Sequence, residues 1–306
     1  MEWNADLIEA LTGQVIGRRR EIEQAVAALA AERHLLLEGP PGTGKSTLLR
    51  SIAQAIGTGF EFVEGNAELT PGRLVGMFDP AAVLEAGYSP DVFIDGPLAA
   101  ALRDGSLLYL EEVNRIPEET LNVLISVMSE GELHIPRLGR LVAAPGFRLV
   151  AAMNPFDAVG TARISGAVYD RVCRLVMGYQ PADDEMMIVA RDATAATQRV
   201  GPGFLLTVVE LVRATRQHAD LRTGSSVRGA IDVVLLCDRL STLRGTDPTD
   251  GNVTLDACLL ALSGRVRVRE GSGRTPEDVV AELWRRFLAP PDAAEESSGA
   301  GDDPKA

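Results

Sequence analysis

The chain has 306 residues, of which 46% are hydrophobic, and a formal net charge of −13. This length suits one large or two medium-sized domains, and the acidic charge argues against broad electrostatic affinity for nucleic acid. No apolar run approaches the roughly 18 residues of a membrane span, and residues 1–6 have neither the basic start nor the apolar stretch of a signal peptide. We therefore expect a cytoplasmic protein with no membrane span.

Helix and strand patterns alternate up to about residue 180. Residues 2–32 are predicted to form two helices, joined by a turn of small residues at 13–17. Apolar runs then predict five strands, at residues 34–38, 60–64, 106–111, 147–153 and 173–178. Because strands that alternate with helices form parallel sheets covered on both faces, we predict an α/β fold for this region.

A phosphate-binding loop follows the first predicted strand. The pattern G-x-x-x-x-G-K-[ST] is matched by the segment Gly39, Pro40, Pro41, Gly42, Thr43, Gly44, Lys45 and Ser46, and we expect Thr47, which follows it, to contact the nucleotide as well. Lys45 is the only lysine in the first 304 residues, and a compact ammonium fits a tight phosphate site better than the planar guanidinium of arginine. We predict that the loop binds ATP, with Lys45 beside the β- and γ-phosphates and Ser46 as a Mg²⁺ ligand.

Two later strands end in polar side chains. The strand at 106–111 ends in Glu111 and is followed by Glu112, and a buried strand presents carboxylates only at its exposed end. Because that end of a parallel strand faces the ligand crevice, we predict that Glu111 holds Mg²⁺ through water and that Glu112 deprotonates the attacking water. Asn154, after the strand at 147–153, could hydrogen-bond that water or the γ-phosphate. Its alternative role is that of a turn residue before a proline.

Two arginines are candidates for phosphate or nucleotide contacts. Arg171 follows a short helical stretch and could reach the γ-phosphate of a neighbouring subunit as an arginine finger. Arg228 lies near the start of a predicted helix and could couple the position of a second domain to the nucleotide state. For both residues, an ordinary surface or ion-paired arginine is the alternative.

From residue 181 the pattern predicts helices alone, at residues 182–197, 203–219, 225–242, 254–263 and 276–288. We predict three parts: a nucleotide-binding domain at residues 1–180, a smaller all-helical lid domain at 181–289, and a disordered acidic tail at 290–306. The three cysteines, Cys173, Cys237 and Cys258, are far apart and lack metal-site spacing, so we expect buried reduced thiols.

Taken in order, these segments resemble an AAA+ ATPase of the MoxR family over nearly all of the chain except the tail. The matching pieces are Gly13-Gln14-Val15-Ile16-Gly17, Leu36-Leu37-Glu38 with the phosphate loop, Asp95-Gly96-Pro97-Leu98, Leu110-Glu111-Glu112-Val113-Asn114-Arg115, Ala152-Met153-Asn154-Pro155, Tyr169-Asp170-Arg171 and Gly224-Ser225-Ser226-Val227-Arg228. The resemblance implies a P-loop AAA+ core with strand order 5-1-4-3-2, a helical lid, and a ring, usually a hexamer, with ATP between subunits.

The resemblance also implies roles for individual residues. Val15 and Ile16 would line the adenine pocket, Asn154 would be the sensor-1 residue, Arg171 the finger and Arg228 the sensor-2 arginine. Residues 66–94 match an insertion in the second helix of the core, and residues 130–146 match a hairpin that in ring ATPases often faces the pore or the client.

The chain departs from the family at two positions. Glu111 stands where the family usually has aspartate, and its extra methylene moves the carboxylate outward, which affects Mg²⁺ geometry rather than nucleotide binding. Val172 replaces an aromatic residue that often follows the finger arginine, which makes Arg163 an alternative finger.

The main hypothesis is an ATP-hydrolysing ring that remodels a client. The resemblance implies a von Willebrand factor A domain protein as partner and a chaperone-like role in the maturation, or metal cofactor insertion, of a client enzyme. A nucleotide-gated scaffold with little turnover is one alternative, to which Glu111 gives some support. A nucleic-acid motor is another; Arg137 and Arg140 on the expected hairpin favour it slightly, and the acidic charge opposes it.

Overall fold

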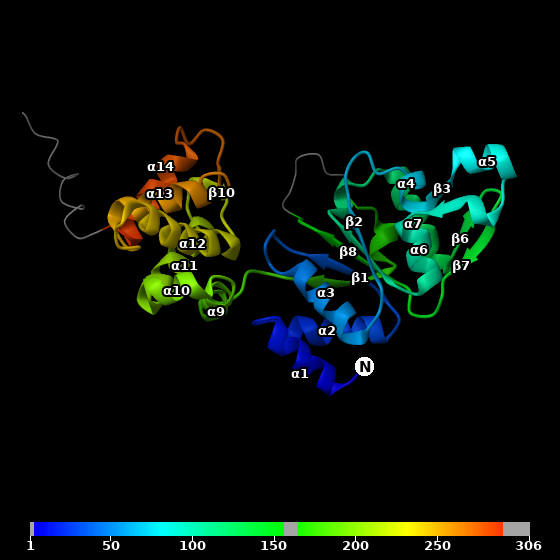
Figure 1. The fold of residues 1–306 in the computed structure, drawn as a ribbon, viewed down its shortest axis with the longest axis horizontal. Coiled ribbons are helices and arrows are strands. Elements are labelled where there is room, and N and C mark those ends of the chain that lie inside the picture. Colours follow the sequence, from blue (N-terminus) through cyan, green and yellow to red (C-terminus); the bar gives the residue numbers. More distant parts are fainter. Residues whose placement is uncertain (1–2, 156–163, 290–306) are drawn as a thin grey trace, which may run out of the picture. The chain divides into compact units, whose positions relative to one another are not determined.

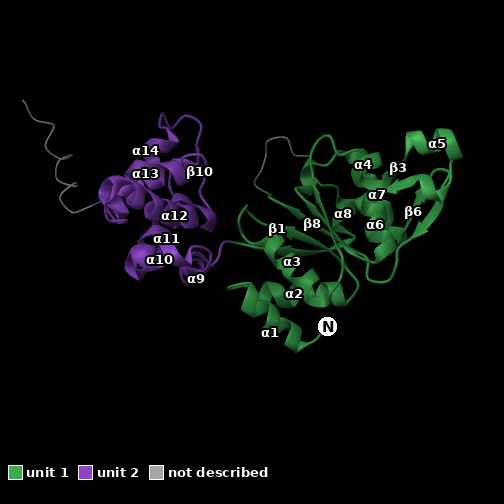
Figure 2. Ribbon diagram, viewed as in Figure 1, with its two compact units in different colours: residues 1–178 green, residues 179–306 purple. Residues whose placement is uncertain are grey.

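The structure is a computed structural model, which describes residues 3–155 and 164–289. The chain divides into two compact units, residues 1–178 and 179–306, which Figure 2 shows in different colours. The predicted acidic tail and the alternative finger Arg163 lie outside the described residues. Within the described ranges, no helix is long and apolar enough to cross a membrane.

A five-stranded parallel sheet forms the centre of the first unit (Figure 1). Its strands are β1 (His34–Glu38), β2 (Phe60–Glu64), β5 (Leu107–Glu111), β8 (Arg148–Met153) and β9 (Val172–Val176). Their order across the sheet is β2-β5-β8-β1-β9, and every neighbouring pair is parallel. With the strands numbered along the chain, this is the order 5-1-4-3-2, so the expected α/β core is confirmed.

Alternate residues of β1 pack against different helices. Leu35 and Leu37 share a buried cluster with residues of α1, α2 and α3, whereas Leu36 packs with residues of α4, α6 and α7. The bounds of these helices are α1 (Ala5–Gln14), α2 (Arg19–Ala30), α3 (Lys45–Ile56), α4 (Pro71–Val75), α6 (Pro97–Asp104) and α7 (Glu118–Glu130). Because both faces of the sheet are covered, β1 is a continuous apolar run rather than an alternating one.

Two antiparallel hairpins belong to the first unit. One pairs β3 (Gly76–Phe78) with β4 (Phe93–Asp95). The other pairs β6 (Glu132–Ile135) with β7 (Gly139–Val142). The segment between β3 and β4 contains α5 (Pro80–Ala86) and the 3-10 helix η1 (Pro90–Val92). The Arg137 guanidinium lies 3.8 Å from the centre of the Tyr88 ring, so the two hairpin regions contact each other.

Helices dominate the second unit. They are α9 (Ala182–Asp192), α10 (Thr194–Val200), α11 (Pro202–Thr215), α12 (Val227–Arg244), α13 (Gly251–Leu262) and α14 (Pro276–Phe287). The single helix expected at residues 182–197 is divided at Ala193. A ribbon of two short strands, β10 (Leu221–Thr223) and β11 (Arg267–Val268), accompanies the helices. The sequence pattern missed this ribbon because two or three residues are too few to show a strand periodicity.

The three cysteines are free thiols, but only two of them are buried. Cys237 and Cys258 lie in the core of the second unit, and burial raises the pKa of the Cys237 thiol to about 12. Cys173 is exposed on β9, so the prediction of a buried thiol is wrong there. Since β9 is an edge strand with one neighbour, it leaves side chains open that a central strand would cover.

Leu36 provides a test of the packing on the sheet. Its side chain is fully buried, and Leu36→Ala should lower the free energy of unfolding by about 2–5 kcal/mol because a cavity replaces the side chain. The matched control is Leu84→Ala on α5, where the leucine is 88% exposed and the change should stay within about 0.5 kcal/mol. Urea denaturation followed by circular dichroism measures both free energies of unfolding. Equal losses in the two variants would contradict the buried position of Leu36 between the sheet and its helices.

His34 opens β1 and occupies a half-buried environment next to two arginines. Its Nδ1 accepts a hydrogen bond from the Leu149 amide at 3.0 Å, and its ring packs edge-on against Phe147. Burial, followed by the charges of Arg148 and Arg33, lowers the pKa of His34 from 6.5 to about 4. The residue therefore serves packing, and it is neutral in the folded protein near pH 7.

This lowered pKa predicts a pH dependence of stability. Between pH 6.5 and about 4 the unfolded chain binds a proton at residue 34 that the folded chain does not, so stability falls as the pH drops through that window. The loss is at most about 3 kcal/mol. Urea unfolding across the window measures it in the wild type, in His34→Gln and in the exposed control His134→Gln. If His34→Gln shows the same pH dependence as the wild type, the loss of stability does not come from His34.

Candidate functional site

The phosphate-binding loop joins β1 to α3. Gly44 has a φ of 86°, a left-handed conformation that favours glycine, and α3 begins at the next residue, Lys45. The Lys45 side chain is buried, and its Nζ donates hydrogen bonds to the carbonyl oxygens of Gly39 at 2.8 Å and Pro40 at 2.9 Å. The loop thus surrounds an ammonium group at a helix N-terminus, where the helix dipole favours a bound anion.

The hydroxyl of Ser46 meets two side chains of β5. Its Oγ lies 3.2 and 3.3 Å from the two carboxylate oxygens of Glu111, and 3.1 Å from Oη of Tyr109. Tyr109 is fully buried on the face of β5 that α3 covers, and burial raises its pKa, so its hydroxyl stays protonated. The sequence analysis missed Tyr109 because nothing in a buried strand shows which residue faces the loop.

Ser46 and Glu111 have the chemistry of a magnesium site. Hydroxyl and carboxylate oxygens are the hard ligands that Mg²⁺ prefers, and Mg²⁺ normally completes its shell with substrate phosphate and water. The two side chains are close enough to bind one ion together. Within the described part of the chain, no group of three or more His, Cys, Asp or Glu could hold a metal by itself. The residues therefore fit an ion held jointly with a nucleotide.

Glu112 occupies a tight turn directly after β5. Its φ of 53° and ψ of 43° are left-handed, and its carbonyl accepts a hydrogen bond from the Arg115 amide at 2.8 Å. Gly65, after β2, packs on this turn, where an added Cβ would lie 2.4 Å from the Glu112 carbonyl oxygen. The Glu112 carboxylate pairs with Arg115 Nε at 3.0 Å, and both side chains are more than a third exposed. Such a pair exchanges partners at a cost of about 1 kcal/mol or less, so the backbone is fixed while the carboxylate can turn.

The sheet brings the predicted residues to one edge. Because β5, β8 and β1 are adjacent and parallel, Glu112, Asn154 and the phosphate loop all follow the carboxyl ends of neighbouring strands. This is the edge at which open α/β sheets bind ligands. Val15, expected at the adenine, ends α1 and is buried with the core, while Ile16 is partly exposed. The chemical roles of Asn154, Val15 and Ile16 stay predictions.

Arg18 contacts the phosphate loop, although the sequence analysis did not single it out. The side chain is 4% exposed, and its Nη2 donates to the carbonyl oxygens of Thr43 at 3.0 Å and Gly178 at 2.6 Å. Its Nη1 pairs with Glu21 at 2.6 Å. The sequence hides this residue because it is the first of three consecutive arginines, at 18–20.

A second buried charge precedes the loop. The Glu38 side chain is almost fully buried, and its carboxylate accepts hydrogen bonds from Tyr169 Oη at 2.9 Å and Arg174 Nε at 2.7 Å. Tyr169 ends the short helix α8 (Gly166–Tyr169), which comes just before Arg171. The carboxylate therefore links the strand that enters the phosphate loop to the segment that contains the candidate finger.

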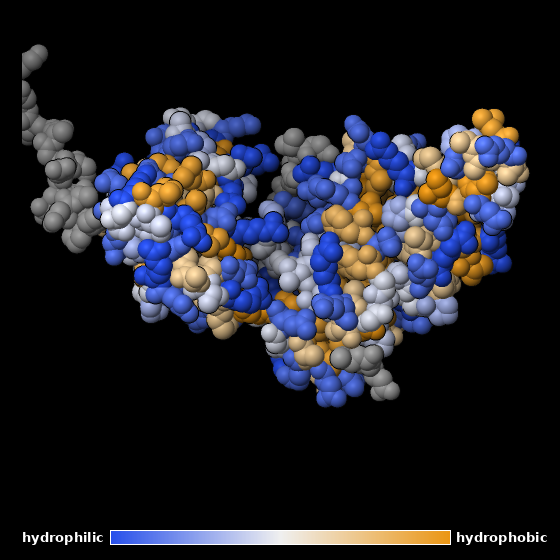
Figure 3. Space-filling view, viewed as in Figure 1, coloured by the Kyte–Doolittle hydropathy of each residue, from blue (hydrophilic) through white to orange (hydrophobic). Residues whose placement is uncertain are grey.

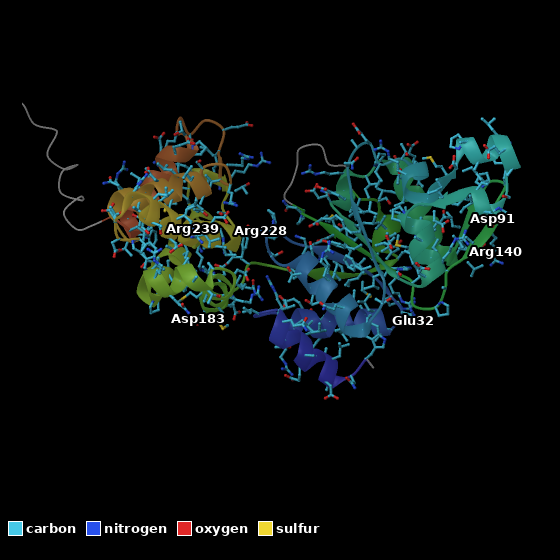
Figure 4. The ribbon with its side chains drawn as sticks, viewed as in Figure 1. Glu32, Asp91, Arg140, Asp183, Arg228 and Arg239 are labelled. Atoms are coloured by element: carbon cyan, nitrogen blue, oxygen red, sulfur yellow. The ribbon has the colours of Figure 1, made fainter. Side chains whose placement is uncertain are left out.

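Of the two candidate arginines, Arg171 shares the first unit with the sheet and lies away from its carboxyl-terminal edge, and Arg228 belongs to the second unit. Arg171 directly precedes β9, whose first residue, Val172, pairs with His34 at the start of β1, so Arg171 lies at the opposite edge. Its guanidinium donates to Ser129 Oγ and, at 2.8 Å, to the Ala167 carbonyl. Arg228 is exposed in the first turn of α12 in the second unit (Figure 4). The finger and sensor-2 roles stay predictions.

Comparison with known families agrees with this geometry. The family model described as the AAA domain of the dynein-related subfamily matches residues 34–172. The matched segment covers less than half of the chain and is similar to this family. It contains the phosphate loop, both glutamates at the end of β5, Asn154 and Arg171. The matched segment includes four of the five strands of the sheet, β1, β2, β5 and β8, and ends where β9 begins.

Individual relatives extend the similarity beyond the AAA domain. The Bacillus subtilis protein YeaC is 27% identical over 264 residues, which cover 78% of this chain and 79% of YeaC. The crystal structure of a presumed ATPase from Cytophaga hutchinsonii covers 93% of both chains, with a TM-score of 0.51 and 19% identity. A point mutant of RuvB from Thermotoga maritima has a TM-score of 0.52 and 19% identity, over 80% of this chain and 70% of RuvB. At these identities the structural matches show the fold alone.

Arg18 should be needed for the shape of the phosphate loop. Arg18→Met keeps most of the side-chain volume but leaves the Thr43 and Gly178 carbonyls without their donor, so ATP affinity should fall about tenfold. Arg20→Met, an exposed neighbour, should bind ATP as the wild type does. Titration with a fluorescent ATP analogue measures both affinities. Wild-type affinity in Arg18→Met would show that Arg18 does not hold the loop.

Proposed function

We propose that this protein is a Mg²⁺-dependent ATPase of the MoxR type, which assembles into a ring, expected to be hexameric, and remodels a client. The contact between Ser46 Oγ and the Glu111 carboxylate is the main support, since it joins the phosphate loop to the acidic end of β5. The match of residues 34–172 to the AAA domain family and the MoxR resemblance support the same proposal. The cytoplasmic location stays a prediction.

The proposed chemistry divides among residues of the carboxyl-terminal edge. Lys45 neutralises the β- and γ-phosphates, and the loop amides hold their oxygens. Ser46 and Glu111 hold Mg²⁺, which when bound neutralises charge on the phosphate oxygens. Glu112 accepts the proton of the attacking water, which Asn154 helps to orient. Positioning and charge carry this reaction, because the protein makes no covalent bond to the phosphoryl group.

Glu111 is compatible with this scheme despite its extra methylene. In the structure its two oxygens already lie within hydrogen-bond distance of Ser46 Oγ, so the longer side chain does not carry the carboxylate away from the loop. Glu112 must leave Arg115 to contact water, and the exposure of that ion pair makes the exchange inexpensive. Both points favour turnover over the alternative of a scaffold that binds ATP without hydrolysing it.

An exposed apolar surface on the first hairpin supports a protein client. Met77 and Ile94, which pair across β3 and β4, are 55% and 57% exposed, and Leu84 on α5 is 88% exposed. Figure 3 shows hydrophobic residues over α5 and the neighbouring hairpin. Monomeric proteins rarely leave such groups together in water unless they bind something. We propose that this surface contacts a client enzyme, and that a von Willebrand factor A domain protein takes part in its maturation or cofactor insertion.

The hairpin arginines give little support to a nucleic-acid motor. Arg137 stacks on Tyr88, and Arg140 pairs with Glu132 on the neighbouring strand. Both guanidinium groups are therefore engaged within the chain. The likeness to RuvB is one of fold, and the acidic net charge opposes binding to a phosphate backbone.

Glu112 and Lys45 should affect different steps, Glu112 the release of phosphate and Lys45 the binding of ATP as well. Glu112→Gln should keep ATP affinity and lower phosphate release at least about 100-fold, because the amide cannot take a proton. Lys45→Ala should lose ATP affinity as well. Glu118→Gln, an exposed glutamate in the first turn of α7, is the matched control and should behave as the wild type does.

Steady-state phosphate release and ATP titration measure these effects. Normal turnover in Glu112→Gln would exclude this residue as the base. If the wild type binds ATP but releases phosphate no faster than the background rate, the ATPase hypothesis is wrong and the nucleotide-gated scaffold is favoured.

A further inference from the structure

A hollow of about 360 Å³ opens at the amino-terminal edge of the sheet. It lies where β1 and β9 begin side by side, since His34 pairs with Val172. Its lining includes Arg33, His34, Met128, Asp170, Arg171 and Cys173. Two arginines from segments far apart in the sequence thus line one concave surface. Neither the family match nor the sequence analysis assigned any role to Arg33.

The charges of the hollow favour an anion. Glu32, in the turn between α2 and β1 (Figure 4), also lines it, but its carboxylate pairs with Arg148 at 3.0 Å. Of the remaining charged groups, Arg33 and Arg171 are two cations and Asp170 is one anion, which leaves a net charge of +1. His34 adds no charge, because its pKa is lowered to about 4.

The Arg171 side chain and the backbone that carries Arg33 are held in place around the hollow. Hydrogen bonds to Ser129 Oγ and the Ala167 carbonyl orient the Arg171 guanidinium. Glu32 has a left-handed φ of 62°, and the Arg33 amide donates to the Ala28 carbonyl at 2.9 Å, which fixes the turn that carries Arg33. Two arginines on defined backbone segments provide forked donors of the kind that bind phosphate oxygens.

The hollow cannot serve the phosphate loop of its own chain. The loop follows the carboxyl end of β1, and the hollow lies at its amino end, five residues away. At about 3.3 Å per residue the two edges are roughly 16 Å apart, which is more than twice the reach of an arginine side chain. A nucleotide phosphate in the hollow must therefore come from another molecule.

We propose that Arg33 acts with Arg171 in this hollow to bind the terminal phosphate of the nucleotide held by a second copy of the chain. Arg33 is then a second trans-acting arginine, which contacts the γ-phosphate beside the predicted finger. The inference rests on the proposed ATPase function. It adds Arg33 to the proposed site and places the trans-acting arginines at the amino-terminal edge of the sheet. The hollow gives the phosphate two arginine side chains rather than one.

Cross-complementation between variants tests the proposal. Arg33→Gln should keep the ATP affinity of the wild type, since its own loop is intact, and lower phosphate release at least about tenfold. Lys45→Ala has no working loop but an intact hollow. Co-expressed with different affinity tags and purified through both, the two variants should form mixed assemblies. At some interfaces of these assemblies the hollow comes from Lys45→Ala and the loop from Arg33→Gln, so both are intact. Phosphate release should then be well above the sum of the rates that the two variants show separately.

The controls separate this proposal from a structural effect and from the ATPase proposal itself. Arg20→Gln, on the exposed side of α2, should leave turnover unchanged. Wild-type turnover in Arg33→Gln, no recovery in the mixed assemblies, or failure of the two tagged variants to purify together would overturn the role of Arg33. Loss of ATP affinity in Arg33→Gln would show that it acts on its own loop or on folding, which also overturns it. Absence of phosphate release by the wild type would reject the ATPase function and this inference with it.

Discussion

The contact between Ser46 and Glu111 is the constraint around which the candidate site is built. Ser46 follows β1 along the chain, whereas Glu111 ends β5, and β8 lies between these two strands in the sheet. The chain leaving β1 must therefore cross about 10 Å, two strand spacings, before its first helical turn meets the acidic end of β5. The glycine-rich loop makes that crossing. At its end the Ser46 hydroxyl lies within hydrogen-bond distance of the Tyr109 hydroxyl on β5. The positions of the Ser46 and Glu111 oxygens, the candidate metal ligands, are thus set by the strand order and not by local sequence.

Buried charges surround the loop, and each has a partner. Lys45 is held by loop carbonyls, Glu38 by Arg174 and Tyr169, and Arg18 by the Thr43 and Gly178 carbonyls and by Glu21. Removing one member of such a set leaves an uncompensated charge at a cost of several kcal/mol, so the arrangement has few alternatives. A rigid loop costs little further ordering when it binds an anion, which is the condition for preorganised binding.

The sequence predicted those parts of the site whose residues are close together in the chain. The phosphate loop and the paired glutamates each lie within a few residues, and a buried strand followed by a polar residue indicates where the chain reaches the edge of the sheet. Tyr109, Arg18 and the partners of Glu38 could not be predicted in this way. Glu38 meets Tyr169 across 131 residues, and such a contact depends on which strands become neighbours. Cys173 shows the same limit, because its exposure follows from the position of β9 at the edge of the sheet.

The strand order was predictable for a different reason. It came from the resemblance of an ordered set of segments, and the parallel pairs of the sheet then fix which residues share an edge. The small ribbon of β10 and β11 had no such support, and its five residues in two pieces were too few to show a pattern of their own.

The opposite placement of the loop and the hollow determines what kind of assembly could complete the site. A surface at the carboxyl-terminal edge of one chain would meet a different surface, at the amino-terminal edge, of the next. Such a contact is heterologous, and repeated heterologous contacts either close into a ring or continue as an open filament. In a closed ring every loop faces one hollow and every hollow one loop, so all nucleotides lie in equivalent surroundings. In a filament the last loop would lack its arginines. If hydrolysis depends on both edges, only a closed ring gives every loop its arginines. The geometry of a single chain therefore favours a ring over a filament.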